Sequence, residues 1–481
     1  MLALTSLLLL MDLSAISFSG GSLPGFLLSS SSANYLLEQG VLTENITFAT
    51  VSGGSLGYMA VTSLQLAYPS LSDAPYTSDA LEGWESKSNA HVAFDLPAKA
   101  LDFSGILVCI MDIILDHEPS PGCKAYAGLS SILPCLGSAI RFSVQRPVWY
   151  CAIQYLIESA GASISDMKAG PSPWHIEYTV FDKAVVPISS AGPQPNPALL
   201  KDRISVSTMF VRDGTEPTFT DSSNFRAKGT HGFDPLHPLQ IELSDAITYS
   251  TSFFSIDTMF KGKDGERCSF TGDQVVDRIL DANYQVNGHL SLSSFLRGVA
   301  TDGGAADLMG LIPLLRQKMR NILTFYVMPM RVDYSPLPNL FGVNATNISA
   351  MLPFDCKGSV LDMIGTTVQV FPSSLWAETS AQMNSLHNTG VTILRDVDVV
   401  ANPAIGVEAY HIDHLMIVDN QRKTAFERSV LAGADIDSLV AQGYPLGGAF
   451  NVPKPVGVAM SLLTQWKLEQ NIDTIRNALH G

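Results

Sequence analysis

Charged residues are scarce in this chain: they make up only 15% of its 481 residues, whereas hydrophobic residues make up 46%. A chain of this composition can bury a large core, so it is not an intrinsically disordered protein. Basic residues are scarcer than acidic ones, with 29 Lys and Arg against 45 Asp and Glu, and they form no basic run. The net charge of −16 argues against nucleic acid as a partner and against a purely electrostatic attachment to anionic membranes.

Cysteines are few as well, and the six present are unclustered, without the spacing of a zinc site. We interpret them as buried or free thiols, and a disulfide among the first four stays open. Long hydrophobic runs are also missing, since no stretch reaches the roughly 18 apolar residues of a membrane span. Residues 1–10 are apolar but lack the basic start of a signal peptide, so a buried strand or helix start is favoured. The expected location is cytoplasmic or peripheral to a membrane, or the secretory pathway if residues 1–15 act as a signal.

Strand-like and helix-like patterns alternate near the N-terminus, and this order is typical of a parallel α/β sheet. A strand over residues 13–18 ends in a glycine turn, and a second strand over 46–51 leads into a helix. Further expected elements are helices over 24–40, 56–68 and 461–479, helical or buried segments over 106–115 and 150–157, and strands over 321–328 and 408–419.

We therefore expect a three-layer α/β/α fold with a largely parallel central sheet in a single domain, residues 1–481. Residues 70–290 are expected to form an insertion rich in helices and loops that includes a lid. Within it, the Pro, Ser, Gly and Asp content of residues 187–240 indicates long loops or a lid. Residues 330–481 are expected to extend the same domain.

The most informative motif is Gly53-Gly54-Ser55-Leu56-Gly57, which lies between an apolar run and a helical pattern. A G-x-S-x-G pattern in this place is the form of a strained strand-to-helix turn that exposes a nucleophilic serine. We therefore predict Ser55 as a nucleophile. Gly53 and Gly57 would be the small residues that let the backbone turn sharply and a carbonyl substrate approach.

A serine hydroxyl is a poor nucleophile until a base takes its proton. Asp302, between Thr301 and two glycines, is the candidate carboxylate, because the turn can hold it rigidly and the glycines leave space beside it. An oxyanion formed on attack needs backbone N–H donors. We predict that Gly20 and Gly21, at the start of a helical pattern, supply them.

These segments together resemble the patatin-like and cytosolic phospholipase A2 superfamily of lipid acyl hydrolases. The order of the segments, a glycine-rich oxyanion loop, then the serine, then the aspartate, is more specific than any one of them. The resembling segments are residues 16–26, 53–57, 243–254, 302–304, 311–316 and 321–325, with a weaker similarity over 173–178.

The resemblance implies a catalytic dyad of Ser55 and Asp302 without histidine, with Gly20 and Gly21 in the oxyanion hole. It also implies a lipid or phospholipid substrate, transient contact with a membrane surface and no cofactor or metal. The chain departs from the family at Ser22 and Pro24, where the family usually has glycine and arginine. Without that arginine, a diglyceride, a lysolipid, a galactolipid or a simple ester is as credible a substrate as a diacyl phospholipid.

Two other functions stay open. The first is a Ser-His-Asp α/β-hydrolase, in which His411 or His414 would be the base that follows the serine and the acid in the sequence. The second is a catalytically inactive patatin-like protein that binds lipid. A metal site at His411-Ile412-Asp413-His414 is disfavoured, because a strand would turn His411 and His414 to opposite faces.

Overall fold

The computed structural model describes residues 13–62, 172–182, 203–213, 216–226, 243–251, 290–292, 296–305, 307–327, 337–343, 369–403, 406–446 and 452–480. The segments expected over 106–115 and 150–157 lie outside these residues, as do residues 1–10 and all six cysteines. Among the described helices, none combines the length and the apolar character needed to cross a bilayer.

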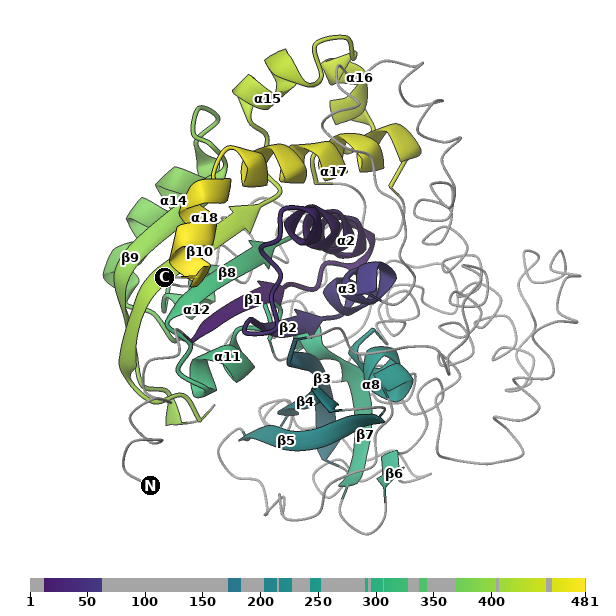
Figure 1. The fold of residues 1–481 in the computed structure, drawn as a ribbon, viewed down its shortest axis with the longest axis vertical. Coiled ribbons are helices and arrows are strands. Elements are labelled where there is room, and N and C mark those ends of the chain that lie inside the picture. Colours follow the sequence, from purple (N-terminus) through teal and green to yellow (C-terminus); the bar gives the residue numbers. More distant parts are fainter. Residues whose placement is uncertain are drawn as a thin grey trace, which may run out of the picture.

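A mixed sheet of ten strands forms the centre of the molecule, with the main path β5-β4-β3-β2-β1-β8-β10-β9 (Figure 1). Its middle is parallel, because β3, β2, β1, β8 and β10 pair in the same direction. Both sides of it are antiparallel, with β4, β5, β6 and β7 on one side and β9 on the other. The α/β class is confirmed, and the parallel pairing is confined to the middle of the sheet. The strands are β1 (Ser14–Phe18), β2 (Thr47–Val51), β3 (Trp174–Asp182), β4 (Arg203–Asp213), β5 (Glu216–Arg226), β6 (Leu290–Leu292), β7 (Leu296–Asp302), β8 (Asn321–Tyr326), β9 (Val391–Val399) and β10 (Tyr410–Asp419).

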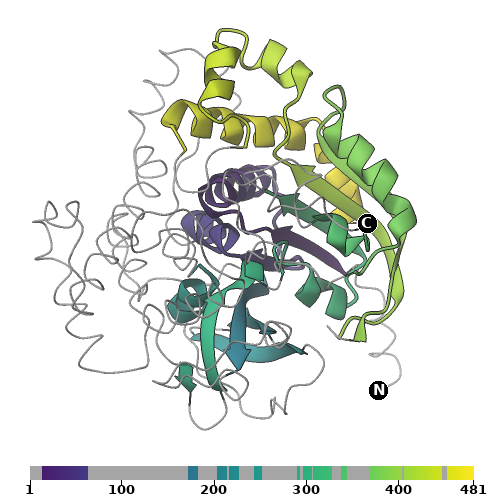
Figure 2. The ribbon, with the colours of Figure 1, turned by 180° about the vertical axis from the view of Figure 1, so that it is seen from behind.

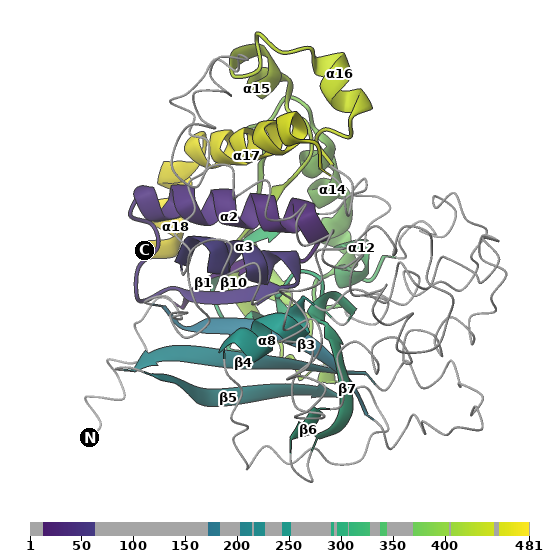
Figure 3. The ribbon, with the colours of Figure 1, turned by 90° about the vertical axis from the view of Figure 1, so that its right-hand side faces the viewer.

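Helices cover both faces of the parallel strands, which explains why every residue of β1, β2 and β8 is buried. On one face α2, α3 and α17 lie side by side, and α8 lies next to α3 (Figures 1 and 3). On the other face α11 and α12 pack on the sheet, and α14 lies along β9 (Figure 2). The helices are α2 (Ser22–Glu38), α3 (Gly53–Thr62), α8 (Leu243–Ser250), α11 (Ile312–Arg316), α12 (Leu337–Leu340), α14 (Trp376–Asn384), α15 (Thr424–Ser429), α16 (Ile436–Ala441), α17 (Lys454–Glu469) and α18 (Ile472–His480), with short 3-10 turns η8 (Gly303–Ala305) and η11 (Ser373–Leu375).

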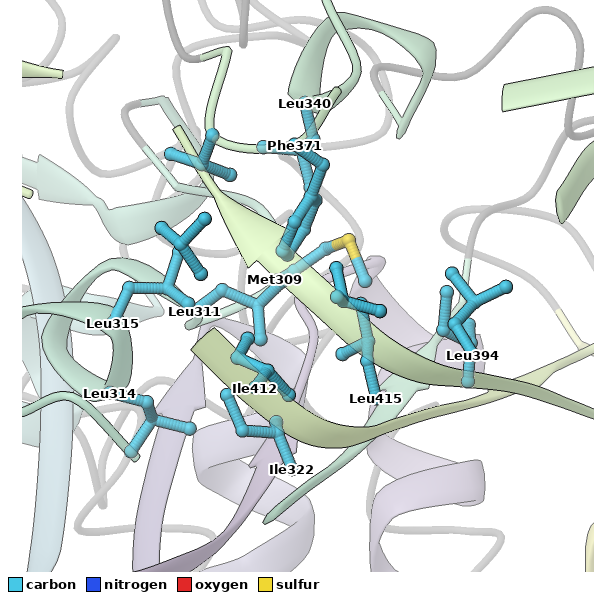
Figure 4. Packing of buried hydrophobic residues seen from close by; sticks show 14 of the residues in the cluster. Met309, Leu311, Leu314, Leu315, Ile322, Leu340, Phe371, Leu394, Ile412 and Leu415 are labelled. Atoms are coloured by element: carbon cyan, nitrogen blue, oxygen red, sulfur yellow. The ribbon is translucent and has the colours of Figure 1, made fainter. Parts of the chain in front are cut away.

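The two faces of the sheet have different cores. Toward α3, an aromatic stack joins Phe18 of β1 to Phe325 of β8 and to Tyr58 of α3, with ring centroids 4.9 and 5.9 Å apart. Toward α11, aliphatic side chains such as Leu311 and Leu314 meet those of β8 and β10 (Figure 4). Both cores remove the alternate side chains of the same strands from water, and this holds the sheet between its two helical layers.

Small residues bring α2 and α3 unusually close together. A Cβ atom added to Gly57 would lie 2.5 Å from the Phe26 carbonyl oxygen and 2.8 Å from the Ser29 Cβ. The polar run over 29–32 lies within α2 and is buried. The hydroxyl groups of Ser30 and Ser32 donate hydrogen bonds to carbonyls of their own helix. These buried polar groups are therefore paired within α2, and their small size leaves room for α3.

The structure corrects two expectations outside the first strands. Residues 187–240 were expected to be loops or a lid, yet β4 and β5 pair there as an antiparallel hairpin. The Ile204-Ser205-Val206-Ser207 alternation favours a strand, and here it outweighs the loop-like composition of the flanking sequence. The helix expected over 461–479 is two helices, α17 and α18, which separate at Gln470 and Asn471.

Candidate active site

The candidate site lies where β2 and β7 both end along the same edge of β3. Along one edge, β3 pairs first with β2, up to the Val51–Glu177 pair. It then pairs with β7, which arrives from the opposite direction and whose Asp302 lies opposite Tyr178. Because β2 and β7 meet nearly end to end, the residue after Val51 lies beside Asp302. That residue is Ser52.

Ser52 and Asp302 form a short hydrogen bond. The Ser52 hydroxyl donates to Asp302 Oδ2 across 2.5 Å, and the Gly304 N–H donates to Asp302 Oδ1 across 2.7 Å. The carboxyl is 2% exposed, and burial raises its pKa to about 7, while the bonds from Ser52 and Gly304 act in the opposite direction. Near neutral pH, Asp302 can therefore both accept and release a proton.

The backbone of Ser52 has the conformation of a sharp strand-to-helix turn. Its φ of 51° lies in the left-handed region, which is rare for a residue other than glycine. The α3 helix begins at the next residue, and the Ser52 carbonyl accepts hydrogen bonds from the N–H groups of Ser55 and Leu56. Strained non-glycine residues of this kind gather at functional sites. The sharp strand-to-helix turn that carries a nucleophilic serine, here called the elbow, has this geometry.

Ser55, the predicted nucleophile, lies in the first turn of α3 and makes different contacts. Its hydroxyl is 2.9 Å from Thr50 Oγ1 and 3.0 Å from Ser250 Oγ. Among the described residues, the side-chain partner of Asp302 is Ser52, so the predicted Ser55–Asp302 bond is not formed. Ser55 is fully buried, whereas Ser52 keeps 7% of its surface exposed.

The glycines of the pattern have a packing role in the structure. Gly54 lies against the end of β1, where an added Cβ would be 2.5 Å from the Phe18 carbonyl oxygen. Gly57 lies against α2, as described above, and Gly53 is the first, buried residue of α3. The G-x-S-x-G spacing around Ser55 thus reflects the close approach of α3 to its neighbours, one turn beyond the strained residue.

The predicted oxyanion loop also lies beside Ser52. A Cβ added to Gly20 would be 3.2 Å from the Ser52 Cβ. The Gly20 N–H, however, donates to the Leu308 carbonyl across 2.8 Å. Gly21 has a φ of 115° and is the N-cap of α2, and a side chain there would overlap the Val327 carbonyl oxygen.

Two helix N-termini point to this end of the sheet. Helix α2 follows β1 and α3 follows β2, and these strands are parallel, so both helices begin at the carboxyl ends of their strands. The first N–H groups of a helix have no partner within the helix, and its positive end favours negative charge. The N–H groups at the starts of these helices, those of Gly21 and Gly53, therefore lie at the same end of the sheet as Ser52.

The histidines of the alternative triad are elsewhere. His414 lies opposite Asn321 at the start of β8, which is the opposite end of the parallel strands from Ser52. His411 is exposed and pairs with Asp396 and Asp398. Within the part of the chain that is described, no histidine hydrogen-bonds to Ser52 or Asp302.

No group of three His, Cys, Asp or Glu side chains that could hold a metal ion occurs among the described residues. In the 411–414 segment, Asp413 pairs with Arg320, and His414 Nδ1 lies 3.0 Å from the Asn321 side-chain oxygen. These side chains are thus directed to separate partners.

No protein-family model matches the sequence, and no curated protein matches it.

Proposed function

We propose that this protein is a serine acyl hydrolase in which Ser52 is the nucleophile and Asp302 is the base. The observation that carries the proposal is the hydrogen bond from Ser52 Oγ to Asp302 Oδ2 at a strained strand-to-helix turn. A hydroxyl bonded to a carboxylate whose pKa is near neutral is the arrangement that proton removal requires.

In the first half of the reaction, Ser52 Oγ attacks the acyl carbonyl carbon and its proton passes to Asp302 Oδ2. The negative charge moves to the carbonyl oxygen, where the N–H groups of Gly53 and Gly21 would stabilise it. The tetrahedral intermediate then collapses to an acyl-serine ester. Asp302 gives its proton to the departing alcohol oxygen.

In the second half, Asp302 takes a proton from a water molecule, and the hydroxide formed attacks the acyl-serine carbonyl. Collapse of this second intermediate releases the carboxylic acid and returns the proton to Ser52. The chemistry uses one carboxyl group as base and acid in turn, and it needs no cofactor or metal.

We further propose a lipid acyl ester as the substrate and a patatin-like arrangement of three layers. Support for both comes from the order of the sequence segments around Gly20, the serine turn and Asp302. The polar head of the lipid stays open between phospholipid, lysolipid, diglyceride, galactolipid and simple ester. Transient contact with a membrane surface would follow from such a substrate.

One observation favours a second candidate, an inactive protein that binds lipid. Because the Gly20 N–H is taken by the Leu308 carbonyl, the oxyanion hole has one donor fewer than predicted. The Ser52–Asp302 bond favours the enzyme, since an inactive protein has no need to maintain a strained serine against a buried carboxyl.

The test is hydrolysis of p-nitrophenyl butyrate and palmitate and of phosphatidylcholine vesicles by wild type, Ser52→Ala and Ser32→Ala. Ser32 is the matched control, because it is also buried and, among the described residues, its hydroxyl donates to the Leu28 carbonyl of its own helix. We expect hydrolysis by wild type and Ser32→Ala and none above background by Ser52→Ala. Full activity of folded Ser52→Ala would refute the nucleophile, and lipid binding without turnover by wild type would support the inactive protein.

A further inference from the structure

A series of hydrogen bonds between buried side chains connects the backbone of Ser52 to β2 and β3. Trp174 Nε1 donates to Thr50 Oγ1 across 2.8 Å, and Thr50 Oγ1 lies 2.9 Å from Ser55 Oγ. Ser55 Oγ lies 3.0 Å from Ser250 Oγ, which accepts the Ser52 backbone N–H across 2.9 Å. All four of these side chains are fully buried. The series of hydrogen bonds therefore runs from β3 through β2 and α3 to α8 and ends on the backbone of Ser52.

The last hydrogen bond of this series, between Ser250 and the Ser52 backbone, is the one that bears on catalysis. Ser52 adopts its positive φ only because the surrounding structure holds it there. Its N–H is held by Ser250, the last residue of α8, which is 198 positions away in the sequence. The bond holds the backbone of Ser52, whereas Asp302 holds its side chain, and it also removes the Ser52 N–H from the set of oxyanion donors.

We propose that Ser250 is a positioning residue for the Ser52 nucleophile and that Ser55 connects it to Thr50. This inference rests on the proposed function, since it concerns the same serine. Neither hydroxyl of the pair touches the Ser52–Asp302 hydrogen bond, so both act through the backbone of the elbow. The G-x-S-x-G pattern at Ser55 thus has a functional role, although its serine supports the nucleophile and does not replace it.

The expected consequence is a loss in turnover without a loss in substrate binding. Without the Ser250 hydroxyl, the buried Ser52 N–H has no acceptor and the turn can relax, which moves Ser52 Oγ away from Asp302. A displacement of the reacting group by about 1 Å costs roughly 100-fold in rate. For Ser250→Ala we therefore expect kcat to fall about 10- to 100-fold while KM changes less than about threefold.

A double-mutant comparison tests the connection to Ser55. If Ser55 acts through Ser250, the variant with both serines replaced by alanine loses no more kcat than Ser250→Ala alone. Thr251→Val is the matched control at the residue that follows α8, since the Thr251 hydroxyl donates to the Ile247 carbonyl of that helix. It should keep the wild-type kcat.

The experiment measures kcat and KM for p-nitrophenyl butyrate in these variants, with circular dichroism as the check of folding. Ser250→Cys keeps the size of the side chain but is a weak acceptor, so it tests the same loss if Ser250→Ala fails to fold. Wild-type kcat in a folded Ser250 variant, with Ser52→Ala inactive, would overturn the positioning role and leave the proposed function intact. An active Ser52→Ala would overturn both.

Discussion

The buried carboxyl of Asp302 should weaken the fold at neutral pH while it serves the reaction. Its pKa is raised to about 7 from an ordinary value of 3.8, because burial disfavours the charged form. Between about pH 4 and 7, the Asp302 carboxyl is therefore protonated in the folded state and ionised in the unfolded state. Stability then falls as pH rises through this window, and it does not recover above pH 7.

The size of the effect follows from the difference between the two pKa values. About three pH units correspond to about 4 kcal/mol of unfolding free energy at pH 8. Asp302→Asn removes the charge and can keep both hydrogen bonds: the amide oxygen accepts from Gly304 N–H, and the amide nitrogen donates to Ser52 Oγ, which reverses the direction of that second bond. We expect this variant to be more stable than wild type by up to about 4 kcal/mol at pH 8 and by almost nothing at pH 4.

The assay is urea unfolding of wild type and Asp302→Asn at pH 4.5, 6 and 8, with ester hydrolysis measured on the same samples. Asp473→Asn is the control, because that carboxylate is 89% exposed and its replacement should change stability by less than about 0.5 kcal/mol. Asp302→Asn should be inactive throughout. If its stability has the same pH dependence as wild type, the carboxyl is not a buried group with a raised pKa, and the assignment of the base fails.

Three further outcomes follow from the same geometry. Since Asp302 must be ionised to act, kcat/KM should fall about tenfold for each pH unit below about 7; a flat pH–rate profile from pH 5 to 8 would contradict it. Gly54→Ala should lower the free energy of unfolding, measured in urea, by about 3 kcal/mol, because its Cβ would lie 2.5 Å from a backbone oxygen. Gly40→Ala is the control: Gly40 has a φ of +66° and nothing within 4 Å, so the loss should be only about 1 kcal/mol. Lys467→Met should cost about 3–5 kcal/mol, because Asp419 then stays buried without the ammonium 2.8 Å from it, and equal stability of variant and wild type would show that the pair contributes nothing.

The central strands could be predicted closely from the sequence. The observed β1, β2, β8 and β10 begin and end within two residues of the predicted ranges, because β1, β2 and β8 are short, largely apolar runs and β10 alternates between polar and apolar residues. The hairpin of β4 and β5 was missed, because its flanking sequence is rich in loop-forming residues.

The candidate site was predicted in part. The glycine turn, the serine region and Asp302 meet as expected, but the hydroxyl beside the carboxyl belongs to Ser52. A five-residue pattern drew attention to Ser55, although a signal for Ser52 was present: it directly follows the last residue of the strand, where a strand-to-helix turn has to lie. The position of Asp302 depends on β7 pairing with β3 in line with β2, and no local pattern encodes pairing over such a distance.

The most direct test of the account is to identify the serine that reacts with a fluorophosphonate. The protein would be labelled, digested with chymotrypsin and sequenced by fragmentation mass spectrometry, since Ser52 and Ser55 lie on the same short peptide between Phe48 and Tyr58. We predict a single adduct on Ser52, lost in Ser52→Ala and Asp302→Asn and still formed on Ser52 in Ser55→Ala. An adduct on Ser55 in wild type, or no adduct in folded protein, would contradict a Ser52–Asp302 dyad.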